Sequence, residues 1–245
     1  ENNQSYIFEY NYKDRLIVRM GYMFNYNSAG ERMANNTIKS NSFSIRAGLE
    51  SAGNVMYAIS NLTKQSKNSD GEYSLLSIPY AQYVKGDFDF SRNIVIDDKN
   101  AIAYHVGVGI AVPYGNSKSI PYIKQYFSGG ANSVRGWSVR ELGPGSFPGD
   151  GNYLNQSGDI KFDASIEYRS KLFWLLQGAL FVDAGNIWTI KEYENQPGGQ
   201  FDISKFYKQI AFAYGLGIRI DLDYLVFRID GGMKALNPAY SSGKQ

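Results

Sequence analysis

Apolar and polar side chains alternate with a period of two along much of this sequence. The pattern is clearest in four stretches, 15–26, 102–112, 160–169 and 210–221. Successive side chains of a β-strand point to opposite faces of the sheet, so each stretch predicts a strand with one apolar and one polar face. Further extended or alternating stretches predict more strands, at 5–12, 43–50, 73–85, 177–188 and 225–231. No stretch has a convincing helical pattern, and the sequence therefore predicts an all-β fold with antiparallel strands.

Alternation fits two architectures, which differ in the face that meets water. A soluble sandwich or lipocalin-like barrel buries its apolar face and exposes its charges. A transmembrane barrel is inverted, with apolar and aromatic residues toward lipid and small or charged residues toward a wet interior. In the second case the even-numbered residues of 160–168 and 210–220 would face lipid.

Three features favour the transmembrane barrel. The predicted strands are about ten or more residues long, as tilted spans of a bilayer need, whereas strands of soluble proteins average about 5–6 residues. Short connections at 169–173 and 221–224 alternate with long ones at 113–157 and 189–207, which is typical of outer-membrane barrels. Aromatic residues recur at strand ends, as in interfacial girdles, at Tyr26, Tyr73, Tyr168, Trp188 and Tyr224.

Composition narrows the classes of function. Of 245 residues, 25 are Lys or Arg and 23 are Asp or Glu, so the net charge of +2 indicates no nucleic-acid partner. The chain has no cysteine and one histidine, His105, so neither thiolate chemistry nor a metal site is predicted. His105 lies on a Gly/Ala-rich face without a serine or acidic residue at motif spacing, which argues against a hydrolase. We therefore expect no enzymatic activity and no cofactor.

No run of apolar residues approaches the ~18–20 that a membrane helix needs, and the longest lies at 172–176. The first residues, Glu1–Gln4, form neither a signal peptide nor a basic leader. We expect that a leader was removed or that the chain is an internal piece of a longer protein.

The long connection at about 113–157 contains the stretch Gly129–Trp137, in which glycines bracket one arginine, Arg135. Glycine allows tight turns, and an arginine offers a planar fork of donors that suits a carboxylate. By composition alone such a stretch is typical of a solvated surface loop. It lacks the Lys-Ser/Thr ending of a phosphate-binding P-loop.

Two carboxylates in the following strands are candidate partners for Arg135. Asp183 interrupts the most apolar predicted strand, where an unpaired carboxylate would be costly. Glu167 lies on the polar face of the strand before it, and it could equally be one of several interior charges. If the loop folds back into the barrel, Arg135 is the natural partner for Asp183, with Glu167 nearby. Such a buried pair fixes a conformation more than it adds stability.

At these residues the sequence resembles the bacterial surface-antigen barrels of the BamA- and TamA-like outer-membrane assembly factors. Three pieces carry the likeness: Tyr122–Phe127 running into Ser133–Trp137, then Gly158–Arg169, then Gly178–Trp188. The first is similar to the family's loop motif, with Val134, Arg135, Gly136 and Trp137 in its four places. Residues 142–146 look like the TamA-like branch.

The resemblance implies a transmembrane antiparallel β-barrel of the 16-stranded insertase type, in which the loop at about 113–157 plugs the lumen. Arg135 would there meet Asp183 and Glu167. Residues 1–245 would form the C-terminal part of this barrel domain, a partial barrel of about nine strands from the seventh or eighth to the fifteenth. The periplasmic POTRA repeats and both strands of the lateral gate would lie outside the chain, so we expect no activity from it alone.

The resemblance also implies a function and a location, the bacterial outer membrane. The protein would be a non-enzymatic assembly factor that helps to fold, insert or translocate barrel or surface proteins. Its partners would be outer-membrane lipid, unfolded or partly folded client proteins and accessory assembly subunits. A two-partner-secretion-type translocator or a passive outer-membrane pore stays open as the alternative, and single-channel conductance would discriminate between a plugged and an open barrel.

Overall fold

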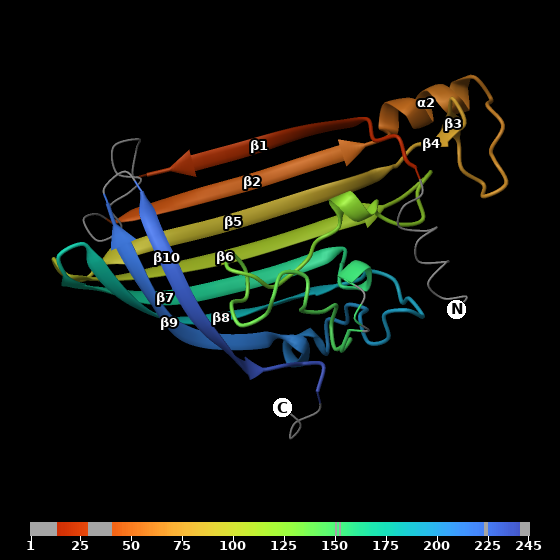
Figure 1. Cartoon of the computed structure of the whole chain (residues 1–245). Coiled ribbons are helices and arrows are strands. Elements are labelled where there is room, and N and C mark those ends of the chain that lie inside the picture. Colours follow the sequence, from red (N-terminus) through yellow and green to blue (C-terminus); the bar gives the residue numbers. More distant parts are fainter. Residues whose placement is uncertain (1–13, 29–40, 150, 152, 223–224, 241–245) are drawn as a thin grey trace.

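A computed structural model describes residues 14–28, 41–149, 151, 153–222 and 225–240 of the chain. Its main element is one eight-stranded sheet, in which neighbouring strands are antiparallel and follow in the order β1-β2-β5-β6-β7-β8-β9-β10. The sheet curves into an open trough with β1 and β10 at its two edges (Figure 1). The all-β prediction is confirmed, as a partial and unclosed barrel wall. The strands are β1 (Arg19–Asn27), β2 (Ser42–Ala52), β5 (Tyr83–Val95), β6 (Asn100–Pro113), β7 (Ile160–Phe173), β8 (Leu176–Trp188), β9 (Ala211–Asp221) and β10 (Val226–Leu236).

Short elements interrupt the long connections between these strands. The helix α2 (Asn54–Leu62) and the hairpin β3 (Ser74–Leu75) and β4 (Ile78–Pro79) lie between β2 and β5. The residues that the structure describes also form three 3-10 helices, η2 (Tyr122–Lys124), η3 (Tyr153–Asn155) and η4 (Phe206–Gln209). Within the described ranges, no helix has the length and apolarity that crossing a membrane requires.

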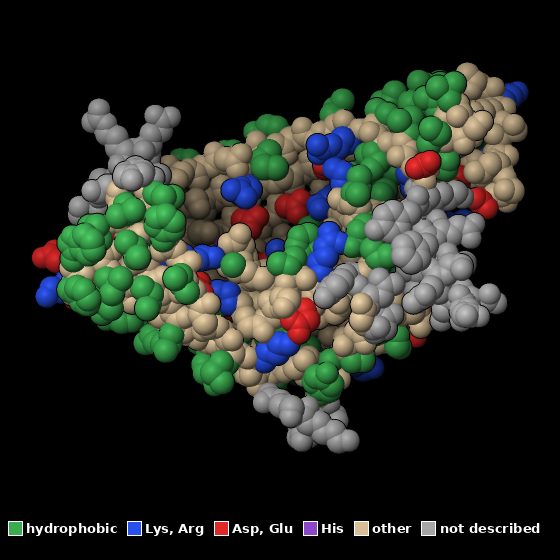
Figure 2. All heavy atoms as spheres, in the orientation of Figure 1, with side chains coloured by type: hydrophobic (Ala, Val, Ile, Leu, Met, Phe, Trp, Pro, Cys, Tyr) green, Lys and Arg blue, Asp and Glu red, His purple; other side chains and the backbone are tan. Residues whose placement is uncertain are grey.

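The two faces of the sheet are inverted relative to those of a soluble protein. On β8, Leu180 and Val182 are 53% and 52% exposed, whereas Phe181 and Asp183 on the opposite face are 3% and 0% exposed. The even-numbered residues of β7 and β9, predicted to point outward, lie on the same exposed apolar face, with Leu216 65% exposed. Figure 2 shows Lys, Arg, Asp and Glu side chains in the hollow of the trough and hydrophobic ones around it. This arrangement suits a wall with lipid outside and a polar interior.

The connection between β6 and β7 folds back into the trough and packs on the inward face. Its Tyr126 hydroxyl donates a hydrogen bond to Asp87 Oδ1 over 2.7 Å. Gly109 makes room for this ring, because a Cβ there would lie 2.6 Å from it. Two buried apolar clusters hold the connection, one of Ala52, Ala81, Tyr83, Ala111, Ile120, Tyr126 and Ile187, the other of Val134, Trp137, Leu142, Ala211 and Ala213. The core therefore lies between the connection and the wall.

The prediction of a strand at 73–85 is wrong. The strand that joins the sheet there is β5, at 83–95, and residues 74–79 form the small hairpin β3–β4. Leu76 and Ser77 turn this hairpin with φ of 49° and 65°. Tight hairpin turns with positive φ normally carry glycine or asparagine, so two ordinary residues gave no turn signal in the sequence.

The helix α2 was not predicted from the sequence, which showed no convincing helical pattern. The helix is nine residues long, starts after Gly53 with a φ of 76°, and buries only Ser60, so its apolar pattern is too short to stand out. Tyr73, predicted at a strand end, instead packs edge-on against Tyr57 of this helix with ring centroids 5.6 Å apart. The extended stretch predicted at 5–12 and the aromatic residue Tyr224 lie outside the described residues.

Candidate functional site

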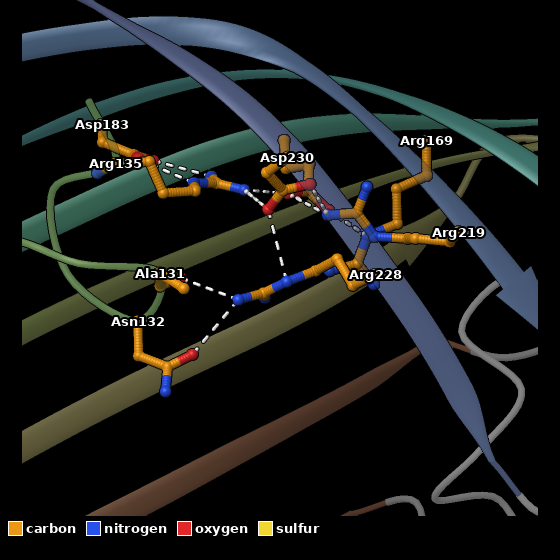
Figure 3. Close-up of polar contacts among 9 residues, drawn as sticks. Ala131, Asn132, Arg135, Arg169, Asp183, Arg219, Arg228 and Asp230 are labelled. Atoms are coloured by element: carbon orange, nitrogen blue, oxygen red, sulfur yellow. Dashed lines mark hydrogen bonds and ion pairs between the residues drawn. The ribbon is translucent and has the colours of Figure 1, made fainter. Parts of the chain in front are cut away.

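Arg135 stands on a loop whose backbone requires glycine. Gly129, Gly130 and Gly136 have φ values of 99°, 87° and 102°, a region that residues with a Cβ rarely adopt. These turns bring the loop down onto the inward face of β8, β9 and β10 (Figure 3). The loop therefore presents one guanidinium to the wall from a shaped support.

Asp183 of β8 accepts three hydrogen bonds from Arg135. The side-chain Nε and Nη2 donate to Asp183 Oδ2 and Oδ1 over 2.7 and 2.8 Å, and the backbone N–H of Arg135 donates to Oδ2 over 3.0 Å. Asp183 is 0% and Arg135 7% exposed. A two-pronged contact of this kind fixes both position and orientation of the guanidinium.

The remaining nitrogen of Arg135 binds two further carboxylates. Its Nη1 donates to Glu167 Oε2 of β7 over 2.8 Å and to Asp230 Oδ2 of β10 over 3.0 Å. Both carboxylates are nearly buried. One side chain thus joins the loop to three strands of the wall.

Three other arginines neutralise these carboxylates. Arg219 Nη2 and Arg169 Nε donate to Glu167 over 2.7 and 2.5 Å. Arg228 Nε lies 3.3 Å from Asp230 Oδ2 and its Nη2 donates to the carbonyl of Ala131 in the loop. We call the set of Arg135, Glu167, Arg169, Asp183, Arg219, Arg228 and Asp230 the arginine–carboxylate network. Buried charges are tolerated when paired and hydrogen-bonded in this way.

Phe181 of β8 forms the floor beneath the guanidinium. The Arg135 Cζ lies 3.4 Å from the centre of the Phe181 ring, a cation–π contact. Gly215 of β9 leaves the space for this ring, because a Cβ at that position would lie 2.4 Å from Phe181 Cζ. The aromatic face and the missing side chain together hold Arg135 flat against the wall.

The inward face of β10 contacts the loop along most of its length. After Arg228 and Asp230, the backbone of Gly232 lies against Gly136. Lys234 then covers the Trp137 ring at 5.4 Å and donates to Glu141 Oε1 over 2.5 Å. Successive inward positions of β10 therefore meet successive parts of the loop.

The structure brings the sequence-predicted residues Arg135, Asp183 and Glu167 into direct contact, with Val134 and Trp137 buried beside them. What this cluster does for the protein stays a prediction. Further members of the site were not predicted from the sequence. The signal that could have found them is their position on the inward face, which the alternation of apolar and polar residues in the last strands indicates. These further members are Arg169, Phe181, Arg219, Arg228, Asp230 and Lys234.

His105 has acidic neighbours that sequence spacing did not indicate. Its Nε2 lies 3.1 Å from Asp89 Oδ1 on β5 and its Nδ1 lies 3.3 Å from Asp163 Oδ2 on β7. Both contacts come from strands that flank β6, so they depend on sheet pairing and not on sequence distance. Over the part of the chain that the structure describes, no cluster of His, Cys, Asp and Glu suits a metal ion.

Comparison with known proteins gives consistent matches. Residues 1–243 match the Omp85 superfamily domain. The chain is 35% identical over 97 residues to outer membrane protein assembly factor BamA of Neisseria meningitidis, which covers 36% of this chain and 12% of that protein. It is 25% identical over 166 residues to a sorting and assembly machinery component 50 homolog of Mus musculus, covering 61% of this chain and 34% of that protein.

A solved structure supports the fold. The crystal structure of BamA from Haemophilus ducreyi lacking POTRA domains 1–3 aligns with a TM-score of 0.50 and 16% identity, covering 89% of this chain and 51% of that chain. The chain thus spans about half of that structure and about a third or less of the two curated relatives. At this identity the structural match establishes the architecture alone.

Proposed function

Because the chain belongs to the Omp85 superfamily, we propose that it is part of a non-enzymatic outer-membrane assembly factor. The protein would help to fold, insert or translocate barrel or surface proteins, with unfolded or partly folded clients, outer-membrane lipid and accessory assembly subunits as partners. Residues 1–245 would be the C-terminal part of its barrel domain, and residues 113–157 the plug of its lumen. Membership in the Omp85 superfamily and the exposed apolar face of the sheet support a location in an outer membrane. The identity to the bacterial relative is higher than the identity to the mouse relative, which supports the bacterial outer membrane.

The observation that carries the proposal is the seating of Arg135 on Asp183 and Glu167. A guanidinium held by several carboxylates in a nearly buried site defines one position of the loop. A loop held inside the barrel occupies the space that a passive pore would leave open to ions. We therefore assign Val134, Arg135, Gly136 and Trp137 to a lock that keeps the loop inside, with Asp183 and Glu167 as its partners.

The test uses the full-length protein that contains this chain, reconstituted in phospholipid vesicles. An unfolded outer-membrane barrel protein is added, and its folding is followed by heat-dependent electrophoretic mobility. We expect client folding to be faster than in protein-free vesicles, and Arg135→Ala to lower the rate. Arg46→Ala is the matched control, since Arg46 is an exposed arginine on β2.

Conductance across a planar bilayer separates this function from the passive pore. A locked loop predicts low and unsteady conductance that rises in Arg135→Ala. Client folding no faster than in empty vesicles, together with steady conductance by the unmodified protein, would reject the assembly function in favour of a pore.

A further inference from the structure

A groove runs across the outward face of β5, β6 and β7, near the end where the long connections leave the sheet. It encloses about 470 Å³. Phe88, Val108 and Ile110 line it from the strands, and Phe201 and Phe206 line it from the connection between β8 and β9. The three strand residues are 42%, 45% and 47% exposed. An apolar depression therefore exists on the face that points away from the polar interior.

Gly86 forms a gap in this face. It pairs with Leu49 of β2 and Ile110 of β6, whose side chains stand outward at 60% and 47% exposure. A Cβ built on Gly86 would meet no heavy atom within 4 Å. The glycine is thus not needed for backbone packing, and it leaves open space between two protruding apolar side chains.

An aromatic cluster forms one side of the groove. Trp188 stacks edge-on against Phe201 at 5.7 Å and Phe206 at 6.5 Å, and the two phenylalanines lie 5.7 Å apart. Trp188 is 1% exposed and its Nε1 donates to Gln209 Oε1 over 2.8 Å. These contacts give the groove a fixed wall even though the connection itself is long.

The two charged residues at the groove have their side chains engaged elsewhere. Asp87 accepts the hydrogen bond from the Tyr126 hydroxyl, and Lys161 Nζ lies 2.6 Å from Asp163 Oδ1. Neither carries a free charge into the depression. The groove therefore offers apolar contact and no polar recognition.

We propose that this groove binds one acyl chain of a membrane lipid. The groove is continuous with the exposed apolar face of the sheet, which in a barrel wall of this superfamily lies against the hydrocarbon of the bilayer. Gly86 lies three residues into β5, about 10 Å along the strand from its first residue, so the groove is part of the strand wall and not of the connections beyond it. A chain seated between Leu49 and Ile110 would fill the gap and contact Phe206. This inference goes beyond assembly activity and does not depend on it.

The first experiment fills the groove by substitution and counts bound lipid. The full-length protein is transferred from phosphatidylethanolamine–phosphatidylglycerol vesicles into detergent, and retained lipid is counted by native mass spectrometry. Burial of about two methylene groups corresponds to roughly tenfold in binding, so we expect Gly86→Leu to reduce retention of one lipid by about tenfold. Gly86→Ala, which adds one methyl group into open space, should reduce it less.

Val182→Phe is the matched control. It also enlarges an outward apolar side chain, but on β8 outside the groove, and it should retain lipid as the unmodified protein does. The second readout is quenching of Trp188 fluorescence by lipids brominated along the acyl chain, isolated by difference from Trp188→Phe. We expect quenching that is weakened by Gly86→Leu and unchanged by Val182→Phe. Equal retention and equal quenching in all variants would overturn the proposal.

Discussion

Gly136 of the loop and Gly232 of β10 lie backbone to backbone. A Cβ on Gly232 would stand 2.7 Å from the amide nitrogen of Gly136 and 3.0 Å from the carbonyl carbon of Arg135. Gly136 itself has a φ of 102°. The close approach is what allows Arg135 to reach Asp183 and Asp230 at the same time, because any side chain between the two backbones would lift the loop off the wall.

We therefore expect Gly232→Ala to weaken the seating of the loop. The added methyl group clashes with backbone atoms, which cannot rotate away as a flexible side chain could. Destabilisation of about 1–3 kcal/mol is typical of overpacking. Protease cleavage of the loop in the full-length protein is the measurement, and it should be faster in the variant.

Gly231→Ala is the control for this experiment. Gly231 precedes Gly232 on the same strand but points outward, and a Cβ there would find its nearest neighbour, the carbonyl oxygen of Leu216, at 4.0 Å. The two variants share the strand and the chemical change. Equal cleavage in both would show that the close contact of Gly136 with Gly232 does not hold the loop.

Much of the sheet could be predicted from the sequence because its strands alternate over long stretches. β6, β7 and β9 each bury one face and expose the other, and their predicted bounds differ from the observed ones by a few residues. β5 was missed although Phe88 and Phe90 alternate with Asp87 and Asp89, because Gly86 interrupts the outward apolar face where the groove lies. When a glycine interrupts the apolar face of a strand, the alternating pattern is broken and the strand is not predicted from the sequence.

Part of the site could be predicted from the sequence, for a different reason. Arg135 and Asp183 stand out because each is a charge in an unusual place, on a glycine-rich loop and in an apolar strand. Asp230 and Arg219 look like ordinary inward charges, and only the register between strands brings Asp230 to Arg135 and Arg219 to Glu167. Register between strands depends on pairing in space, which alternation within one strand does not encode.

Asp159, which lies just before β7, should contribute to the pH dependence of the stability of the folded protein. Burial disfavours its charged form and raises its pKa above 3.8, although a hydrogen bond from the Ile190 N–H opposes this. A carboxyl with a raised pKa in the folded state stabilises most below its unfolded pKa, and the contribution is lost as pH rises through the folded value. Asp159→Asn should therefore raise the thermal midpoint of the full-length protein at pH 7, with a smaller difference near pH 4.

Asp202→Asn should show the opposite sign. Hydrogen bonds from the side chain and backbone of Ser204 lower the pKa of this exposed carboxyl, so its contribution is present above 3.8 and is lost as pH falls. The variant should be less stable than the unmodified protein at pH 7 and should approach it near pH 4. A lower midpoint for Asp159→Asn at pH 7 would contradict the burial argument for Asp159, and a higher midpoint for Asp202→Asn would contradict the hydrogen-bond argument for Asp202.

Expressed alone, residues 1–245 should associate with other copies or with other proteins. Within the described residues, β1 and β10 each pair with one strand and leave the other edge open. Unpaired backbone groups are not tolerated in hydrocarbon and are templates for further strands. Size-exclusion chromatography in detergent should show large or heterogeneous species. A monodisperse monomer with protected amides along both edges would refute this expectation.

The contact of Arg135 with Asp183 makes the sharpest prediction. Arg135→Ala leaves Asp183 buried without its main partner, and Asp183→Ala removes the two-pronged acceptor of the guanidinium. Breaking a buried pair on one side costs about 3–5 kcal/mol, compared with about 0–1 kcal/mol for a surface pair. We expect each single variant to lower barrel stability by about 3 kcal/mol, and the double variant by clearly less than the sum. The measurement is a double-mutant cycle on the full-length protein, read from heat-dependent mobility.

Arg135→Lys distinguishes the geometry of the contact from its charge. An ammonium group keeps the charge but cannot donate along two parallel directions to Asp183 while also reaching Glu167 and Asp230. It also loses the flat contact with the Phe181 ring. The lysine variant should therefore recover only a small part of the stability and of client folding lost in Arg135→Ala. Full recovery by lysine, or strict additivity in the cycle, would mean that a simple charge at this position is sufficient and that the shaped network around Arg135 does not hold the loop.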